Sequence, residues 1–243
     1  MVMKTGSSGR LEQYRSRYAR LRSGWIPATA RYQTWVAGAL SGESRILDLG
    51  CGRGGIVERL GEIGRWIGID ADIDSLRTHR RPSLPRCCAP SELLPFPKCS
   101  FDIVVASWVL EHLATPAAAF REIARLLRPG GRFFLLTPNR MHLLPRASGF
   151  IAGLRPVQAA AVSLVYRRRP ADTFPVAYRA NTAGDIERLA TEAGLRLARL
   201  EWVEDPSYLA WNTPSFLAAV VIDLAQRGQA RVHLVGELIR TKP

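Results

Sequence analysis

The stretch Ile46–Gly55 reads I-L-D-L-G-C-G-R-G-G and decides the fold of this chain of 243 residues. An aliphatic run that ends in an aspartate and then breaks into glycines is typical of a buried strand that turns sharply into a helix and holds a ligand at the turn. We therefore expect Arg45–Leu49 to be the first strand of an α/β domain. The kind of ligand depends on the charged residues around the glycines.

Strands and helices are predicted to alternate along most of the chain. Short aliphatic runs between Gly, Pro and polar residues indicate strands, and the segments between most of them favour helices. This order predicts an α/β fold class: a doubly wound, Rossmann-like, mostly parallel sheet of seven strands, which should bind its ligand at the carboxyl ends of the strands. The predicted strands are Arg45–Leu49, Trp66–Ile69, Arg86–Ala89, Phe101–Ala106, Arg132–Thr137, Leu195–Val203 and Arg231–Ile239.

Several helices have recognisable ends. Thr115 followed by Pro116 is typical of an N-cap with proline at the first helical position, and Thr182 with Asp185 resembles a capping box. The apolar helix Ser215–Gln226 is expected to be part of the core. The predicted helices are Leu11–Arg22, Ala28–Leu40, 55–63, Asp72–Arg80, 116–127, Val157–Tyr166, 182–193 and Ser215–Gln226.

The length suits a single full-sized domain with its own core. Within it we expect N-terminal helices (1–44), a ligand-binding core (45–139), a lid insertion after strand five (140–180) and C-terminal strands and helices (181–243). The N-terminus has no apolar run that could act as a signal peptide, and the four cysteines lack the spacing of a zinc site. A cytoplasmic protein without a bound metal is therefore expected.

The chain is strongly basic, with a formal net charge of +13. Such a charge favours anionic partners such as nucleic acid, an acidic lipid surface or a phosphorylated substrate. An arginine-rich proteome is the alternative explanation, because the basic residues are scattered along the whole sequence. No RNA-binding motif and no basic stripe with interleaved aromatic residues is present, which argues against a nucleic-acid-binding module.

The glycine turn fits two ligand classes. Gly50-x-Gly52-x-x-Gly55, with Asp70 further on, matches the dinucleotide fingerprint. Asp48 argues against a dinucleotide, because two anions at roughly 4–6 Å repel by around a kcal/mol even when screened. A ligand with a cationic amino acid end would instead be attracted to Asp48. S-adenosylmethionine, with its ammonium and sulfonium, is such a ligand.

Several ordered blocks between residues 45 and 139 resemble the class I S-adenosylmethionine-dependent methyltransferases, in particular small-molecule methyltransferases of the ubiquinone/menaquinone type. Their order along the chain is more specific than any one of them. Beyond Asn139 only the order of elements agrees. The blocks are Ile46–Gly54, Ile67–Asp70, Leu94–Val105, Leu110–Leu113, Leu127–Gly131 and Thr137–Asn139.

This resemblance implies a set of cofactor contacts. Asp48 and the turn Gly50-Cys51-Gly52 would hold the methionine part, Asp70 would accept hydrogen bonds from both ribose hydroxyls, and Ser91 with Glu92 falls where the family binds adenine. The sequence departs from the family at Pro90, where an aspartate is common, so adenine recognition must depend on backbone groups or on Glu92. The remaining expected cofactor-binding residues are Ala71 and Ser107.

The reaction needs a base only if the acceptor loses a proton. His112 is the candidate catalytic residue, because it follows the fourth strand and histidine titrates near neutral pH. The alternative is that Glu111-His112 only starts a helix. Other polar residues on loops expected to reach the ligand are Asn139, Arg140, Tyr178 and Asp205.

The second substrate is less well defined. The insertion Met141–Tyr178 mixes apolar residues with arginines, which favours either a helical cap over the sheet or a surface for an amphiphilic acceptor at an anionic membrane. The predicted function is methyl transfer from S-adenosylmethionine to a small or lipid-linked acceptor, with oxygen the favoured acceptor atom. An RNA methyltransferase and a nicotinamide-dependent oxidoreductase are the alternatives.

Overall fold

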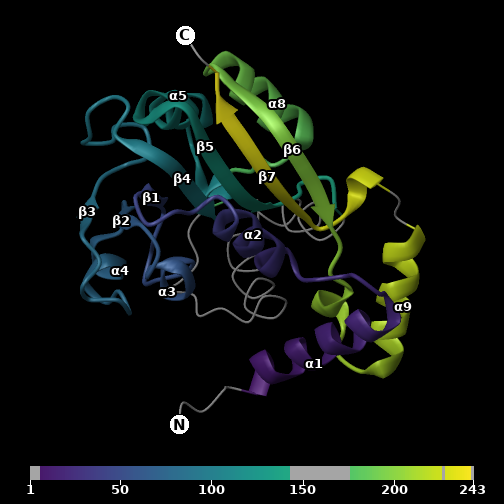
Figure 1. The fold of residues 1–243 in the computed structure, drawn as a ribbon. Coiled ribbons are helices and arrows are strands. Elements are labelled where there is room, and N and C mark those ends of the chain that lie inside the picture. Colours follow the sequence, from purple (N-terminus) through teal and green to yellow (C-terminus); the bar gives the residue numbers. More distant parts are fainter. Residues whose placement is uncertain (1–5, 143–175, 226–227, 242–243) are drawn as a thin grey trace. The chain divides into compact units, whose positions relative to one another are not determined.

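The computed structural model describes residues 6–142, 176–225 and 228–241 (Figure 1). The chain forms two compact units. Unit 1 contains Met1–Ala28, Asn139–Pro175 and Trp202–His233, and unit 2 contains Thr29–Pro138, Val176–Glu201 and Leu234–Pro243. The predicted helix Val157–Tyr166 and most of the predicted lid insertion lie outside the described residues.

The sheet has the strand order β3-β2-β1-β4-β5-β7-β6. The neighbours from β3 to β5 pair in parallel, and Asp48 on the central strand β1 lies opposite Gly68 on β2 and Val105 on β4. The predicted fold class, a mostly parallel Rossmann-like sheet of seven strands, is confirmed. The strands are β1 (Arg45–Leu49), β2 (Arg65–Asp70), β3 (Arg86–Cys88), β4 (Phe101–Ser107), β5 (Leu127–Pro138), β6 (Leu195–Val203) and β7 (His233–Arg240).

Helices of unit 2 cover the sheet (Figure 1). On α5 the buried residues recur at helical spacing, and its Phe120 meets Phe133 of β5 edge to face with ring centroids 5.8 Å apart. Burial of such an aromatic side chain contributes about 2–3 kcal/mol. These helices are α2 (Ala28–Ala37), α3 (Val57–Leu60), α4 (Ile73–Arg77), η1 (Leu110–His112), α5 (Pro116–Leu126) and α8 (Ala183–Glu192).

Unit 1 has its own small core. Its described elements are α1 (Gly6–Leu21), η3 (Pro206–Leu209), α9 (Thr213–Ala225) and η4 (Gly228–Ala230). Tyr14 of α1 stacks on Phe216 of α9 with ring centroids 5.0 Å apart, and Tyr18 meets Trp25 edge to face. Among the described helices, none combines the length and the apolar character needed to cross a bilayer.

The helix that was predicted to be core is only half buried. Phe216, Ala219 and Asp223 of α9 face inward, but the large apolar side chains between them are exposed. The prediction was wrong because α9 is apolar on both sides, so its sequence contains no polar face that would mark the side exposed to solvent.

Two other predictions need correction in detail. Strand β5 begins at Leu127, before the Pro-Gly-Gly turn, because Leu127 pairs with Phe101 and the register then jumps so that Arg132 pairs with Ile103. The side chain of Thr115 does not cap α5 and instead donates a hydrogen bond to Glu92 at 2.7 Å. The capping box at α8 is confirmed, since Thr182 accepts from the N–H of Asp185.

Candidate active site

The glycine turn joins β1 to α3 at the centre of the sheet. Its N–H groups donate to acceptors within the chain. The N–H groups of Gly50 and Cys51 donate to the carbonyl of Ile69, and the N–H of Gly52 donates to the carboxylate of Asp70. The N–H of Gly54 donates to the carbonyl of Cys51. A pyrophosphate is normally held by free N–H groups at such a turn. Because these donors are already used, the turn suits a ligand that does not need them.

Glycine is required at position 50 for two reasons. Its φ of +71° lies in the left-handed region that disfavours side chains. A Cβ at this position would also overlap the Cγ2 of Val109, which follows β4. The turn therefore packs directly against the segment that leads to His112.

Asp48 is the most unusual acid of the site. It is 3% exposed, and its Oδ2 has no hydrogen-bond partner among the described residues. Burial, and secondly the charge of Asp70, raise the pKa of Asp48 to about 7. A buried carboxylate without a partner is costly, and a cationic group placed beside it removes that cost. The site thus fits a ligand with an ammonium group.

Asp70 ends β2 and organises the loops on both sides. Its Oδ2 accepts the N–H of Gly52 and its Oδ1 accepts the N–H of Asp72, both at 2.8 Å. Asp72 in turn caps α4. Each carboxylate oxygen has two acceptor positions, so Asp70 retains capacity for the two hydroxyls of a ribose.

Ser91 and Glu92 lie together beyond β3. Glu92 accepts hydrogen bonds from Ser91 at 3.0 Å and from Thr115 at 2.7 Å. Burial alone would raise the pKa of Glu92, but these hydrogen bonds outweigh it and hold the pKa below its usual value. Glu92 is therefore an ionised acceptor. Pro90 contributes only its carbonyl, which accepts the N–H of Leu93 at 3.2 Å.

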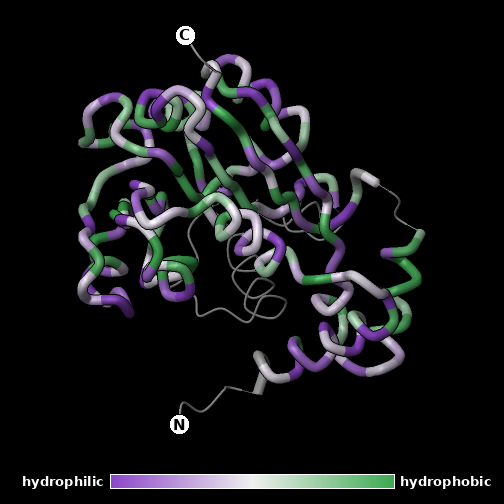
Figure 2. The backbone as a smooth tube through the Cα atoms, viewed as in Figure 1, coloured by the Kyte–Doolittle hydropathy of each residue, from purple (hydrophilic) through white to green (hydrophobic). Residues whose placement is uncertain are grey.

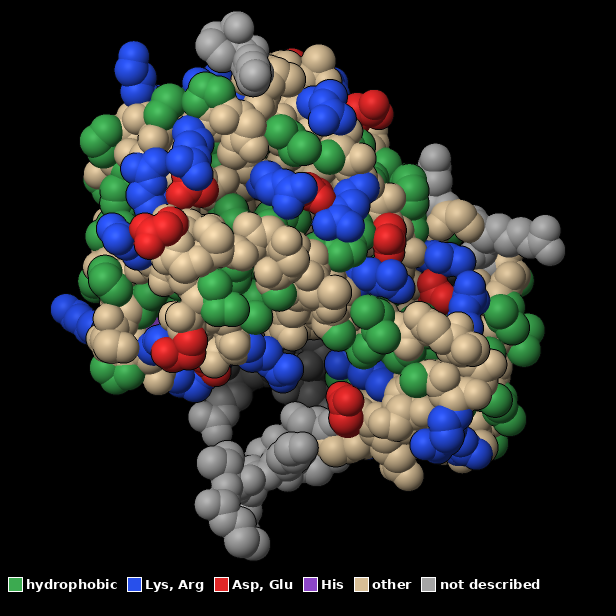
Figure 3. All heavy atoms as spheres, in the orientation of Figure 1, with side chains coloured by type: hydrophobic (Ala, Val, Ile, Leu, Met, Phe, Trp, Pro, Cys, Tyr) green, Lys and Arg blue, Asp and Glu red, His purple; other side chains and the backbone are tan. Residues whose placement is uncertain are grey.

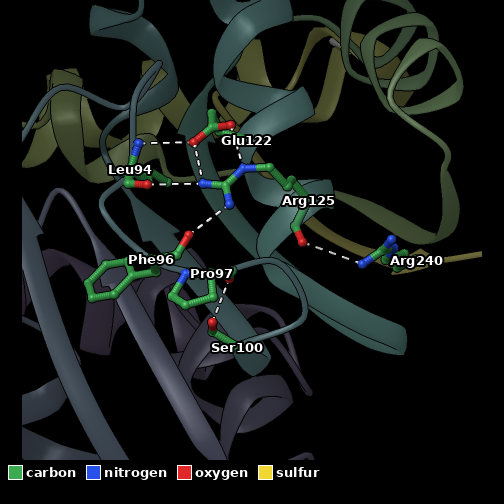
Figure 4. Close-up of polar contacts among 7 residues, drawn as sticks. All are labelled: Leu94, Phe96, Pro97, Ser100, Glu122, Arg125 and Arg240. Carbon is green, nitrogen blue, oxygen red and sulfur yellow. Dashed lines mark hydrogen bonds and ion pairs between the residues drawn. The ribbon is translucent and has the colours of Figure 1, made fainter.

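The loop that follows Glu92 is clamped by two residues of α5 (Figure 4). The guanidinium of Arg125 donates to the carbonyls of Leu94 and Phe96 and to the carboxylate of Glu122. Glu122 also accepts the N–H of Leu94 at 2.9 Å. The pair lowers the pKa of Glu122 and raises that of Arg125, each chiefly through their mutual hydrogen bonds. This clamp fixes the backbone next to the predicted adenine site.

Three other predicted cofactor-binding residues differ in what they offer. The Cys51 side chain faces the sheet, because a Cβ on Gly68 would lie 2.8 Å from its Sγ, so only the backbone of Cys51 is free to face a ligand. Ala71 is exposed and its carbonyl accepts from Cys88. Ser107 is the last residue of β4 and is half-buried.

His112 is half-buried at the end of η1. The preceding Glu111 is buried and accepts a hydrogen bond from Thr137, which itself accepts one from Asn181. The carbonyl of Glu111 accepts the N–H groups of Ala177 and Tyr178. This network joins η1, the end of β5 and the segment that follows the insertion, so the backbone of Tyr178 lies beside η1.

The other predicted polar residues belong to unit 1. Asp205 is held by Arg15 at 2.7 Å and by Ser207, and the side chain of Asn139 donates to the carbonyl of Arg231 at 2.7 Å. Arg140 is exposed in the same unit. Asp205 and Asn139 therefore have structural partners of their own. Among the described residues, no group of three or more His, Cys, Asp or Glu side chains could hold a metal ion.

The sequence did not single out Tyr32 of α2. Tyr32 is almost completely buried, with 1% of the residue exposed. Burial, and secondly the charge of Asp48, raise the pKa of Tyr32 well above its usual value, while the backbone of Ala106 acts in the opposite direction. The phenol therefore lies at the carboxyl ends of β1 and β4. Its only signal in the sequence is its place on the buried side of a helix, where tyrosine is also common for packing alone.

Trp108 was also missed. It follows β4 with a φ of 60°, in the left-handed region, while its N–H donates to the carbonyl of Leu136 at 2.8 Å. A non-glycine residue in this conformation costs of order 1 kcal/mol and is commonly found at functional sites. No sequence pattern indicates such a backbone angle.

Comparison with known proteins identifies the domain that carries these features. Residues 47–135 match the family described as "Methyltransferase domain". The ubiquinone biosynthesis O-methyltransferase of Bordetella pertussis is 37% identical over 128 residues, which are 49% of this chain and 50% of the relative. A probable S-adenosylmethionine-dependent methyltransferase of Mycolicibacterium smegmatis is 38% identical over 104 residues, 41% of this chain and 40% of the relative. The chain spans about half the length of the curated relatives it matches.

Solved structures share the fold. The S-adenosylmethionine-dependent methyltransferase from Mesorhizobium loti superposes with a TM-score of 0.59 at 20% identity, covering 88% of this chain and 98% of the other. The geranyl diphosphate C-methyltransferase from Streptomyces coelicolor, solved with S-adenosyl-L-homocysteine, gives a TM-score of 0.61 at 14% identity, covering 88% and 79%. At these identities the likeness concerns the fold.

Proposed function

Because this chain carries a class I S-adenosylmethionine-dependent methyltransferase domain, we propose that it transfers a methyl group to the oxygen of a small or lipid-linked acceptor. The blocks predicted from the sequence coincide with the matched residues 47–135. The O-methyltransferases among the relatives support oxygen as the acceptor atom, and their ubiquinone pathway supports an amphiphilic acceptor.

The orphaned carboxylate of Asp48 is the observation that carries the proposal. Its Oδ2 is buried and has no hydrogen-bond partner in the part of the chain that the structure describes, and Asp48 lies close enough to Asp70 for the two charges to interact. A cationic amino acid end would neutralise Asp48, whereas the pyrophosphate of a dinucleotide would bring two further negative charges beside the two carboxylates. The same observation disfavours a nicotinamide cofactor.

We assign the cofactor contacts as follows. Asp48 and the backbone carbonyls of the turn Gly50-Cys51-Gly52 would hold the methionine part, since the N–H groups of this turn already donate within the chain. Asp70 accepts the ribose hydroxyls, with Ala71 beside it. Ser91 and the ionised Glu92 would hold adenine, since Pro90 supplies no side-chain acceptor, and Ser107 would complete the set at the end of β4.

His112 is proposed as the base. S-adenosylmethionine, when bound, supplies a methyl group that its sulfonium already activates. The chain then has to align the acceptor oxygen with that methyl group and exclude water. His112 would take the proton that the acceptor hydroxyl loses when its oxygen receives the methyl group. The Glu111 network supports this role because it fixes the backbone of η1.

The cofactor is tested by calorimetry with S-adenosylhomocysteine and NADH in parallel. Binding of the first and not the second is expected, and the reverse would refute the proposal. Lipid extracts and RNA are then incubated separately with methyl-labelled S-adenosylmethionine. Label in a lipid-extractable product is expected, with an acid-stable methyl ether as the signature of oxygen transfer. Label only in RNA would identify the alternative acceptor.

The role of His112 is tested separately. His112→Ala should lower the turnover number by 10²–10⁴-fold while leaving the affinity for S-adenosylhomocysteine unchanged, because the residue acts on the acceptor. The loss should shrink when a more acidic acceptor analogue is used. Full activity of His112→Ala would show that the acceptor needs no base at this position.

A further inference from the structure

The helix α9 has an inverted distribution of polar and apolar residues. Its one ionisable residue, Asp223, faces inward together with Phe216 and Ala219. After the first turn, its outward side carries apolar side chains along two adjacent rows. In Figure 2 hydrophobic colouring predominates along much of the helix. The exposed fractions are 52% for Leu217, 65% for Val221, 40% for Ile222 and 56% for Leu224.

This outward side is not needed for the core of unit 1. The inward side already packs against that core, where Phe216 contacts Tyr14 and Val220 is partly buried. Trp211, which immediately precedes α9, adds a further exposed aromatic side chain at 55%. Monomeric proteins rarely expose a contiguous apolar surface of this kind, and where one occurs it commonly marks an interaction site. We call these five side chains, Trp211, Leu217, Val221, Ile222 and Leu224, the α9 surface.

Arginines of α1 border the α9 surface. Arg10 donates to the carbonyl of Trp211 at 3.5 Å, and Arg17 donates to Thr213 at 3.1 Å while its guanidinium lies over the ring of Phe216. Arg20 is exposed on the same helix. In Figure 3 hydrophobic side chains lie over α9 with Lys or Arg side chains next to them. The border of the apolar surface is therefore positively charged.

We propose that the α9 surface docks this chain on an anionic membrane. Exposed aliphatic side chains with a tryptophan at the edge suit the boundary between headgroups and acyl chains, and arginines at the border suit acidic headgroups. A second copy of this chain is a poorer partner, because it would bring a second set of arginines against the first. The inference does not depend on methyl transfer, since docking needs neither cofactor nor acceptor.

Vesicle flotation tests the apolar part of the surface. The full chain is mixed with vesicles of phosphatidylcholine alone or of phosphatidylcholine with phosphatidylglycerol. Binding to the anionic vesicles is expected to be at least about tenfold stronger and to weaken with added salt. Leu217→Ser/Val221→Ser/Leu224→Ser should lose this binding. Ile63→Ser, which changes an exposed isoleucine of unit 2, should bind as the unmodified chain does.

A second pair of variants tests the charged border. Arg10→Gln/Arg17→Gln should weaken binding to the anionic vesicles and reduce its salt dependence. Arg121→Gln/Arg188→Gln removes the same charge from exposed helical positions of unit 2 and should have a smaller effect. Equal losses in the two pairs would mean that net charge alone drives binding, which would overturn the assignment to the α9 surface.

Other occupants give different results. Absence of salt-sensitive binding by the unmodified chain would overturn the proposal, as would undiminished binding by the triple serine variant. A dimer in light scattering that the triple variant converts to a monomer would assign the α9 surface to self-association instead. Circular dichroism and thermal melting of each variant establish that it is folded, so that lost binding reports on the surface.

Discussion

Asp70 and Gly52 are joined by a hydrogen bond of 2.8 Å, in which the carboxylate at the end of β2 accepts the N–H of the glycine turn. The other oxygen of Asp70 accepts the N–H of Asp72. One side chain thus holds the shape of two loops and still has acceptor positions for a ligand. Its role in shaping the site can be separated from its role in binding by choosing a substitution that preserves its size.

Asp70→Asn is expected to weaken S-adenosylhomocysteine binding by about 10- to 100-fold, because hydrogen bonds to a charged group contribute about 1.5–3 kcal/mol. Calorimetry measures the affinity, and a thermal melt reports any loosening of the two loops. Asp74→Asn is the matched control, since Asp74 is an exposed acid of the adjacent helix α4. Unchanged affinity in Asp70→Asn would remove Asp70 from the ribose site.

Cofactor binding is expected to release a proton from Asp48. Its pKa is raised to about 7 in the free protein. An ammonium beside the carboxylate favours the ionised form and lowers that pKa, so affinity should rise with pH from about 5.5 to 7.5 and the proton should leave on binding. Calorimetry in two buffers of different ionisation enthalpy measures the proton count. Asp48→Asn should bind weakly and show neither effect.

Gly50→Ala is expected to destabilise the protein and abolish cofactor binding. The new methyl group would overlap Val109 and would sit on a backbone with positive φ. Overpacking of this kind costs about 1–3 kcal/mol, and the backbone angle adds about 1 kcal/mol. Gly55→Ala is the control in the same loop, because a Cβ there meets nothing within 4 Å and its φ is not positive. Chemical denaturation of both variants measures the difference.

A double variant separates the two costs at position 50. Val109→Ala removes the overlap but leaves the strained backbone at position 50. Gly50→Ala should therefore lower the free energy of unfolding by less in the Val109→Ala background than in the unmodified chain. An equal loss of unfolding free energy in the two backgrounds would mean that backbone strain accounts for the whole effect of Gly50→Ala.

Arg125→Lys is expected to weaken cofactor binding although the charge is kept. Lysine cannot reproduce the planar set of donors that reaches Leu94, Phe96 and Glu122 at the same time. The loop beside Ser91 and Glu92 should then become more mobile, with a loss of affinity of about 3- to 10-fold. Arg121→Lys, one turn earlier on the exposed side of α5, is the control. Equal affinities of the two variants would confine Arg125 to a role in stability.

The sequence predicted those parts of the structure that depend on local patterns. β1 and β6 have the predicted bounds because their aliphatic runs end in Gly or in acidic residues. Asp48 and Asp70 lie at or next to the carboxyl ends of their strands, and their role in cofactor binding stays a prediction. Tyr32 and Arg125 could not be assigned in this way. Their roles depend on which segments the fold brings next to them, and a tyrosine or arginine on a helix has no local feature that distinguishes these partners.

In the helix α9 a local sequence pattern is present but predicts burial wrongly. Its sequence correctly predicts a helix, but its apolar composition also predicts burial, which is wrong for the outward side of the helix. Periodicity identifies a buried side only when the other side is polar, and here the single acid Asp223 faces inward. Burial of that acid has a measurable consequence for stability.

Asp223→Asn is expected to stabilise the protein above neutral pH. Burial, and secondly the charges of Glu204 and Asp205, raise the pKa of Asp223 to about 7, while Arg231 and Arg22 act against this shift. In the unfolded chain the carboxyl of Asp223 ionises near pH 4. Between about pH 4 and 7 the unfolded state therefore binds fewer protons than the folded state, and the free energy of unfolding falls as the pH rises.

The expected gain for Asp223→Asn is therefore small at pH 4 and on the order of 2–4 kcal/mol at pH 8. Urea unfolding of the variant and the unmodified chain at both pH values measures it. Asp74→Asn, at an exposed acid, should show no such growth with pH. A gain for Asp223→Asn that is equal at pH 4 and pH 8 would mean that Asp223 ionises normally in the folded state. The inward-facing carboxyl would then be solvated rather than buried, and the inverted pattern of α9 would need another explanation.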